Sequence, residues 1–185
     1  MTEVQAEYLE VIATRSSGMR RPDSPGRRAI SLADRIEQGA ATLAGFVGGL
    51  SNENWSRPAS GSDKRSVGTL VHHVASVYPI EIQLAQAIAE GHAVTDVTWK
   101  AVAELNAKHA AEHPAPDKFE TLELLARNSR DAAAAVRAFT EEQMDRAAPF
   151  SLSFGAPMTA QFVIEDHAVR HSWQHLAQIK SAVAQ

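Results

Sequence analysis

The strongest structural signal in the chain is residues 66–91, SVGTLVHHVASVYPIEIQLAQAIAEG. Ser66 is a typical N-cap residue, and Gly91 is typical of the position that follows a helix C-terminus. Apolar residues between them recur three and four positions apart, as on one face of an α-helix. The segment therefore predicts a long amphipathic helix. Pro79 predicts a kink near its middle, because proline removes a backbone donor and crowds the carbonyl group of Ala75.

Helical periodicity also marks residues 31–50 and 119–139, a last segment that opens at Met158 or Thr159 and runs almost to the C-terminus, and one shorter segment, 98–113. Residues 52–65 are dense in Pro, Gly, Ser and Asn and predict a loop, and residues 148–158 predict a loop or a brief extended piece over the bundle's end. No segment alternates apolar and polar residues over a useful length, so a sheet is not expected. We predict an all-α four-helix bundle with one long crossover between its second and third helices and a short extra helix.

Composition narrows the possible functions. The length of 185 residues predicts one domain, and an apolar fraction of 44% is enough for a core. Without cysteine the chain cannot form disulfides, thiolate zinc sites or cysteine nucleophiles. The net charge of −4 argues against nucleic acid as a partner. Because no apolar run approaches the roughly 20 residues of a membrane span and no secretion signal is evident, we expect a cytoplasmic protein without a membrane partner.

The first thirty residues differ from the rest in charge and composition. Residues 1–30 carry five arginines against four acids, mixed with proline and glycine. They are either a poorly ordered leader or an arm that seeks phosphate groups. The bundle itself is expected to occupy residues 31–185.

Helix phase separates two adjacent histidines of the 66–91 segment. Successive residues of a helix differ in direction by about 100°. His73 therefore points into the edge of the apolar stripe, whereas His72 shares its side with Ser76 and Gln83 and should meet solvent. Of this pair, only His73 is a candidate site residue.

The last helix carries three histidines at intervals of four residues, His167, His171 and His175. His171 and His175 face the apolar side most directly. Two imidazoles one helical turn apart can bind a single divalent ion, and His73 from a facing helix would complete a three-histidine site with an open coordination position. The alternative is that each inward histidine is a hydrogen-bonded core residue.

Three further polar residues are candidates for supporting the ligands or lining a pocket. Glu81 lies inside the apolar arc but about 12 Å along the helix from His73, so it pairs with an arginine of another helix or lies in a substrate pocket. Asn106, like His109, either faces the bundle or belongs to a surface helix. His167 either orients a ligand or meets solvent.

Three motifs resemble the DinB-like superfamily, the DinB/YfiT metal-dependent bundles. They are LSNENWSRP at residues 50–58, RSVGTLVHHVASVY at 65–78 and HSWQHLAQI at 171–179. The resemblance extends over residues 31–185, and Arg65 departs from it where the family pattern often has tryptophan. It implies an up-down-down-up bundle that binds Zn, Ni or a similar ion. Carried over by position, its ligands are the same three histidines, His73, His171 and His175.

The resemblance also implies a class of reaction. Characterised relatives include enzymes that transfer or isomerise groups with a low-molecular-weight thiol such as mycothiol or bacillithiol. We therefore expect a metal-dependent transferase or isomerase that acts on a small-molecule substrate. We also expect a homodimer. The alternatives are metal-assisted hydrolysis by a bound hydroxide and a non-catalytic bundle that binds a metal or a small ligand.

Overall fold

The computed structural model describes residues 25–59 and 64–184. Within them the helices and strands are, in chain order, α1 (Arg27–Gly48), α2 (Asn52–Ser56), α3 (Val67–Ala89), α4 (Trp99–Glu112), α5 (Lys118–Arg137), α6 (Glu141–Asp145), β1 (Ala147–Pro149), β2 (Pro157–Thr159), α7 (Ala160–Val163) and α8 (Arg170–Val183). A 3₁₀ turn (Ser151–Ser153) lies between the strands, and a π-helical segment (Ile164–Val169) joins α7 to α8.

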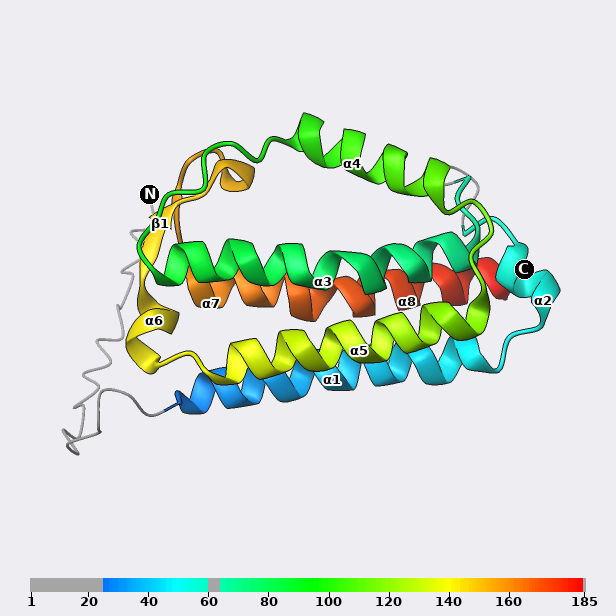
Figure 1. Cartoon of the computed structure of the whole chain (residues 1–185), viewed down its shortest axis with the longest axis horizontal. Coiled ribbons are helices and arrows are strands. Elements are labelled where there is room, and N and C mark those ends of the chain that lie inside the picture. Colours follow the sequence, from blue (N-terminus) through cyan, green and yellow to red (C-terminus); the bar gives the residue numbers. More distant parts are fainter. Residues whose placement is uncertain (1–24, 60–63, 185) are drawn as a thin grey trace, which may run out of the picture.

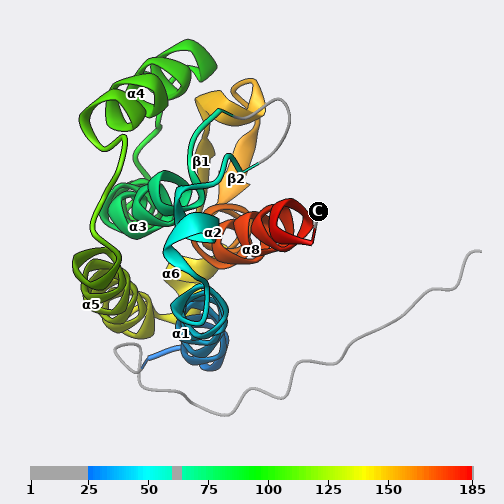
Figure 2. The ribbon, with the colours of Figure 1, turned by 90° about the vertical axis from the view of Figure 1, so that its right-hand side faces the viewer.

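The bundle is formed by α1, α3, α5 and a last helix that consists of α7, the π-helical segment and α8. The first and last of these run opposite to the middle two (Figure 1). Seen along the bundle, α5 packs on both α1 and α3, and α8 closes the fourth side (Figure 2). The predicted up-down-down-up order is therefore confirmed. Because α3 and α5 are parallel neighbours, their connection returns along the bundle, and α4 lies in it outside α3.

The core between the four helices is apolar, and its large fully buried side chains include Ile36, Leu43, Leu70, Leu125 and Ile179. One polar pair joins two helices inside this core, because the Tyr78 and Ser172 hydroxyl oxygens lie 2.6 Å apart. No helix of the described residues has both the length and the apolar character needed to cross a bilayer.

The first helix begins earlier than its sequence pattern indicates. It starts at Arg27, four residues before the predicted N-cap Ser31. The Arg28 guanidinium donates to the Asp145 carboxylate at 2.7 Å, which ties the start of α1 to α6. Arg27 and Arg28 thus belong to the bundle, and the prediction of a poorly ordered leader otherwise falls on residues 1–24, outside the described part.

Helix α3 continues through Pro79 because another helix compensates for the missing donor. Proline has no N–H for the Ala75 carbonyl, and the Asn128 side chain of α5 donates to that oxygen at 2.8 Å. At its ends α3 matches the sequence prediction. The Ser66 hydroxyl accepts from the Thr69 N–H, and Gly91 adopts a positive φ of 85°.

The prediction of a loop over residues 52–65 is wrong at its start. Ser51 caps the short helix α2, which buries Trp55. The Trp55 indole donates to the Pro116 carbonyl at 3.0 Å and packs directly on Gly68. A Cβ at position 68 would lie 2.5 Å from Trp55 Nε1, so only glycine fits this contact.

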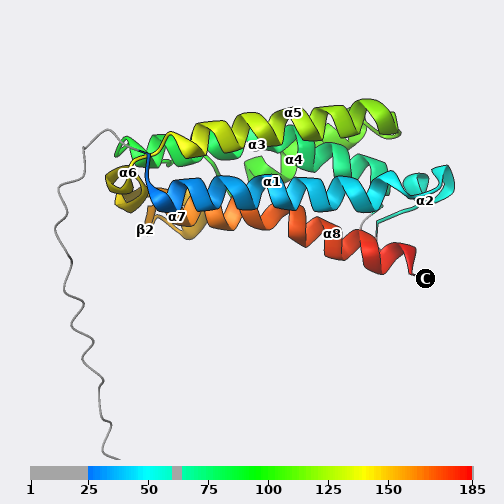
Figure 3. The same ribbon diagram turned by 90° about the horizontal axis from the view of Figure 1, so that it is seen from below.

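One end of the bundle is closed by short elements. Strands β1 and β2 pair antiparallel over three residues each, so a small two-stranded sheet is present where no sheet is expected from the sequence. Its place over the bundle's end agrees with the predicted brief extended piece. Helix α6 was not predicted, although Thr140 and Gln143 form a capping box at its start. From below, α7 and α8 follow one another along α1 (Figure 3).

Candidate metal centre

The structure brings together the three histidines that the sequence singles out. His73 on α3 and His171 and His175 on α8 each offer one ring nitrogen, and these nitrogens lie within 4.8 Å of one another. His73 is 5% exposed and His175 is 7% exposed, whereas His171 is half-buried. We call these three residues the inner cluster; their role as metal ligands stays a prediction.

The rings of the inner cluster converge from two sides. The centroids of the His171 and His175 rings are 4.7 Å apart, as expected one turn apart on a helix. The His73 ring faces this pair edge-on, with centroid distances of 5.1 and 5.7 Å. This arrangement is compatible with three imidazoles on one ion, which leaves a further coordination position for another molecule.

Two side chains fix the orientation of the α8 imidazoles. His171 Nδ1 lies 2.6 Å from Glu81 Oε1, and His175 Nδ1 lies 3.1 Å from Gln178 Oε1. Since these oxygens accept, each Nδ1 donates, and the neutral ring then carries its lone pair on Nε2. A histidine that donates to a carboxylate through one nitrogen is typical of a metal ligand that uses the other.

Glu81 pairs with a different type of residue from the one that the sequence predicts. The partner is the His171 imidazole, so the predicted arginine is wrong, and a supporting role of Glu81 at the site stays a prediction. Its other oxygen, Oε2, is buried and has no hydrogen-bond partner in the described part of the chain. A buried carboxylate with an orphaned oxygen is costly unless positive charge lies nearby. Glu81 and the all-imidazole donor set therefore fit a cation.

The electrostatics keep His73 neutral. Burial, together with smaller contributions from the neighbouring His171 and His175, lowers the pKa of its imidazole to about 2. A metal ligand must present a lone pair, so a histidine that resists protonation is suited to that role.

A cleft of about 160 Å³ between α3 and α4 leads to His73. Its walls are partly apolar and partly polar, with lining residues His73, Ser76, Val77, Ile80, Leu105, Asn106, Lys108, His109 and Glu112. Asn106 and His109 thus face the bundle, in agreement with one of the two predicted alternatives. A molecule in this cleft would contact α4 on one side and His73 on the other.

His167 lies outside the inner cluster but near Glu81. Its half-buried ring meets the Phe150 ring edge-on at 5.7 Å. Burial lowers its pKa, and the nearby charges of Glu81 and Asp166 raise it in part. His167 belongs to the π-helical segment, so its direction relative to His171 departs from the α-helical phase.

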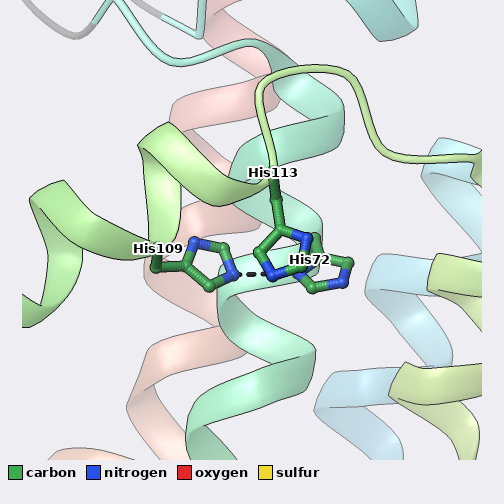
Figure 4. Close-up of side chains that lie close together, drawn as sticks. All are labelled: His72, His109 and His113. Atoms are coloured by element: carbon green, nitrogen blue, oxygen red, sulfur yellow. Dashed lines mark hydrogen bonds between the residues drawn. The ribbon is translucent and has the colours of Figure 1, made fainter.

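The prediction that His72 meets solvent is wrong. Its Nδ1 lies 2.8 Å from His109 Nε2, and its ring stacks on His113 with a centroid distance of 4.0 Å (Figure 4). Burial lowers the pKa of His72 to about 4, with smaller contributions from His113 and His109. Periodicity could not reveal this contact, since it says nothing of where α4 packs.

Replacing Glu81 by glutamine should weaken metal binding by about 10- to 100-fold. The amide oxygen can still accept from His171 Nδ1, but the negative charge that makes the imidazole a better ligand is lost. The change is measured as the dissociation constant of Zn²⁺ in competition with a chromophoric chelator. Glu104→Gln, on the exposed side of α4, is the matched control. An unchanged affinity in Glu81→Gln would show that the carboxylate does not support the ligand.

Comparisons with known proteins agree with the fold. The solved structure of YfiT from Bacillus subtilis, described as a probable metal-dependent hydrolase with an unusual four-helix bundle topology, superposes with a TM-score of 0.66. The two chains are 20% identical, and the match covers 95% of this chain and 91% of the YfiT chain. Among curated proteins, none matches the sequence significantly. The family profile of the DinB superfamily matches residues 35–179, which contain α3 and α5 entirely and most of α1 and α8. The chain belongs to the DinB superfamily.

Proposed function

We propose that this protein is a metal-dependent enzyme in which the inner cluster holds a divalent ion, Zn²⁺ or Ni²⁺, and a small molecule reacts in the cleft between α3 and α4. The observation that carries the proposal is that His73 belongs to both the inner cluster and the cleft. Its ring nitrogen is one of three that lie within 4.8 Å of one another, and its side chain lines the cleft. Imidazole donors suit several transition metals, so elemental analysis must identify the ion.

The residues around the cluster have separable tasks. Glu81 and Gln178 hold the two α8 imidazoles in one orientation. Val77 and Leu105 give the cleft an apolar lining, and Lys108 at the cleft offers a positive charge to a polar or anionic group. When bound, the ion would supply Lewis acidity, which lowers the pKa of a thiol or a water molecule at the open position.

The reaction that we favour is transfer or isomerisation with a low-molecular-weight thiol, which the family resemblance supports. The sequence has no cysteine, so a sulfur nucleophile must arrive with a soluble cofactor. In a transfer, the thiolate sulfur forms a bond to an electrophilic carbon. The leaving group departs with the electron pair of its broken bond, and the thiol proton passes to solvent.

Metal-assisted hydrolysis is the second candidate, and the description of YfiT supports it. It needs water in place of the thiol and no change in the ligands. The two reactions are therefore separated by their requirement for thiol and not by the geometry of the cluster.

The test is a screen of Zn²⁺- and Ni²⁺-loaded protein against alkyl halides, epoxides, esters and amides, each with and without mycothiol or bacillithiol. We expect substrate conversion that requires both the metal and the thiol and that falls by at least about 100-fold in His171→Ala; the thiol is consumed in a transfer and regenerated in an isomerisation. His92→Ala, whose exposed side chain lies outside the cluster, should behave as the parent protein. Turnover of esters or amides without thiol would select hydrolysis. Bound metal without turnover in either arm would contradict an enzymatic role.

A further inference from the structure

A second group of histidines lies on the outer side of α3. His72 on α3, His109 on α4 and His113 at the end of α4 each offer one ring nitrogen, and these nitrogens also lie within 4.8 Å of one another. All three are half-buried. Figure 4 shows their rings gathered where the last turn of α4 meets α3. We call these residues the outer cluster.

The outer cluster repeats the design of the inner one. His171 and His175 are four residues apart on α8, and His109 and His113 are four residues apart at the end of α4. Adjacent positions of α3 differ in direction by about 100°, so one histidine of the pair in α3 turns to α8 and the other to α4. His73 therefore faces two imidazoles one helical turn apart on α8, and His72 faces two imidazoles one helical turn apart at the end of α4.

The contacts within the outer cluster are close. His72 Nδ1 lies 2.8 Å from His109 Nε2, so only one of these nitrogens can carry a hydrogen and the other must present its lone pair. The His113 ring stacks on His72 and lies 4.9 Å from the His109 ring. Three ring nitrogens at this spacing can meet a single ion after the His113 ring turns out of its stack. That turn is feasible because His113 follows the last helical residue of α4.

Helix α4 has little else to hold it against the bundle. None of its residues is buried. Near its end, the Thr69 hydroxyl contacts the His113 carbonyl at 2.9 Å and the Pro114 carbonyl at 3.2 Å. An ion bound by residues of both α3 and α4 would thus add a strong link where the described contacts are few.

We propose that His72, His109 and His113 bind a second divalent transition-metal ion, distinct from the ion of the inner cluster, and that this ion fastens α4 to α3. The ion belongs to the class that imidazoles prefer, such as Zn²⁺ or Ni²⁺, and not to Mg²⁺ or Ca²⁺, which prefer oxygen donors. Because Leu105, Asn106 and Lys108 of α4 line the cleft, fastening α4 also fixes one wall of the substrate site.

The two clusters are adjacent but separable by mutation. The His109 ring meets the His73 ring at 5.5 Å, so a change at His109 or His73 can affect both. His113 makes ring contacts only with His72 and His109 among the described residues, and His171 contacts only the inner cluster in the same sense. His113→Ala and His171→Ala are therefore the informative pair of variants.

The experiment is calorimetric titration of the full-length, chelator-stripped protein with Zn²⁺. The parent protein should bind about two equivalents, and His113→Ala and His171→Ala about one each. His92→Ala controls for an exposed histidine outside both clusters. Circular dichroism verifies that each variant keeps its helix content, and His72→Gln must reproduce the loss if His113→Ala does not fold.

A second measurement tests whether the ion fastens α4. Amide hydrogen exchange in residues 99–112 should slow by about tenfold or more on metal addition in the parent and in His171→Ala, but not in His113→Ala. Two equivalents in His113→Ala, or one equivalent in the parent that is lost in His171→Ala, would overturn the proposal. If only the inner cluster fails to bind metal, His171→Ala binds the same number of Zn²⁺ equivalents as the parent protein. The two proposals therefore fail in different ways.

Discussion

Replacing His73 by alanine should weaken metal binding at the inner cluster by at least about 100-fold and abolish metal-dependent turnover. His73 is the one member of that cluster on α3, and it faces a pair of imidazoles that both come from α8. With His73 absent, two of the three imidazoles would stay, and the cavity left at a position that is 5% exposed would admit water in place of nitrogen. Elemental analysis after dialysis against a weak chelator measures the loss.

The measurement is cleanest in a His113→Ala background, because the outer cluster then contributes no metal. In that background the metal content should fall from about one equivalent to below about a tenth on His73→Ala and equally on His171→Ala. His92→Ala in the same background should retain it. Stoichiometric metal in both variants of the inner cluster would remove that site.

Replacing Phe150 by alanine should lower the free energy of unfolding by about 3–5 kcal/mol, the range for truncating a buried phenylalanine. Phe150 follows β1 at the closed end of the bundle and is 1% exposed. Its ring also meets His167 edge-on, so the cavity would open beside the π-helical segment. Urea denaturation followed by circular dichroism measures the change as a shift in midpoint at constant slope.

The same turn supplies the matched control for this prediction. Phe154 lies four residues later, is 96% exposed and buries almost nothing. Phe154→Ala should therefore change the free energy of unfolding by less than about 0.5 kcal/mol. Equal losses in the two variants would mean that the turn acts through its backbone and not through the Phe150 ring.

The long helices and the inner cluster could be predicted because both depend on one regular property, the helical period. The relative direction of His171 and His175 follows from their spacing, and both lie in α8, where the α-helix is regular. His167 lies in the π-helical segment. The wider turn of a π-helix changes the direction of each of its side chains relative to those of α8. The same phase argument therefore works for the pair and not for the residue one turn earlier.

The errors of sequence reasoning concern what covers a helix face and not which face exists. Phase places His72 correctly on the side of α3 away from the core. It cannot show that a crossover helix with no buried residues covers that side. Glu81 is similar, because its inward direction is predictable whereas its partner depends on how α3 and α8 align lengthwise. Helix α2 was missed since its only large anchor, Trp55, stands among loop-forming residues.

Because α3 and α5 pack in parallel, the chain between them must be long enough to return along the bundle. Any length beyond that minimum is open to change. Helix α3 has 23 residues, so the return path is about 34 Å, which roughly ten extended residues would cover. The chain uses residues 90–117, nearly three times that number. Since the entropic cost of a loop rises by only about 0.6 kcal/mol for each doubling of its length, descendants of this fold can lengthen, shorten or replace α4 while the four-helix scaffold survives. The crossover is thus the segment of the bundle that can change in length and sequence at the least risk to folding.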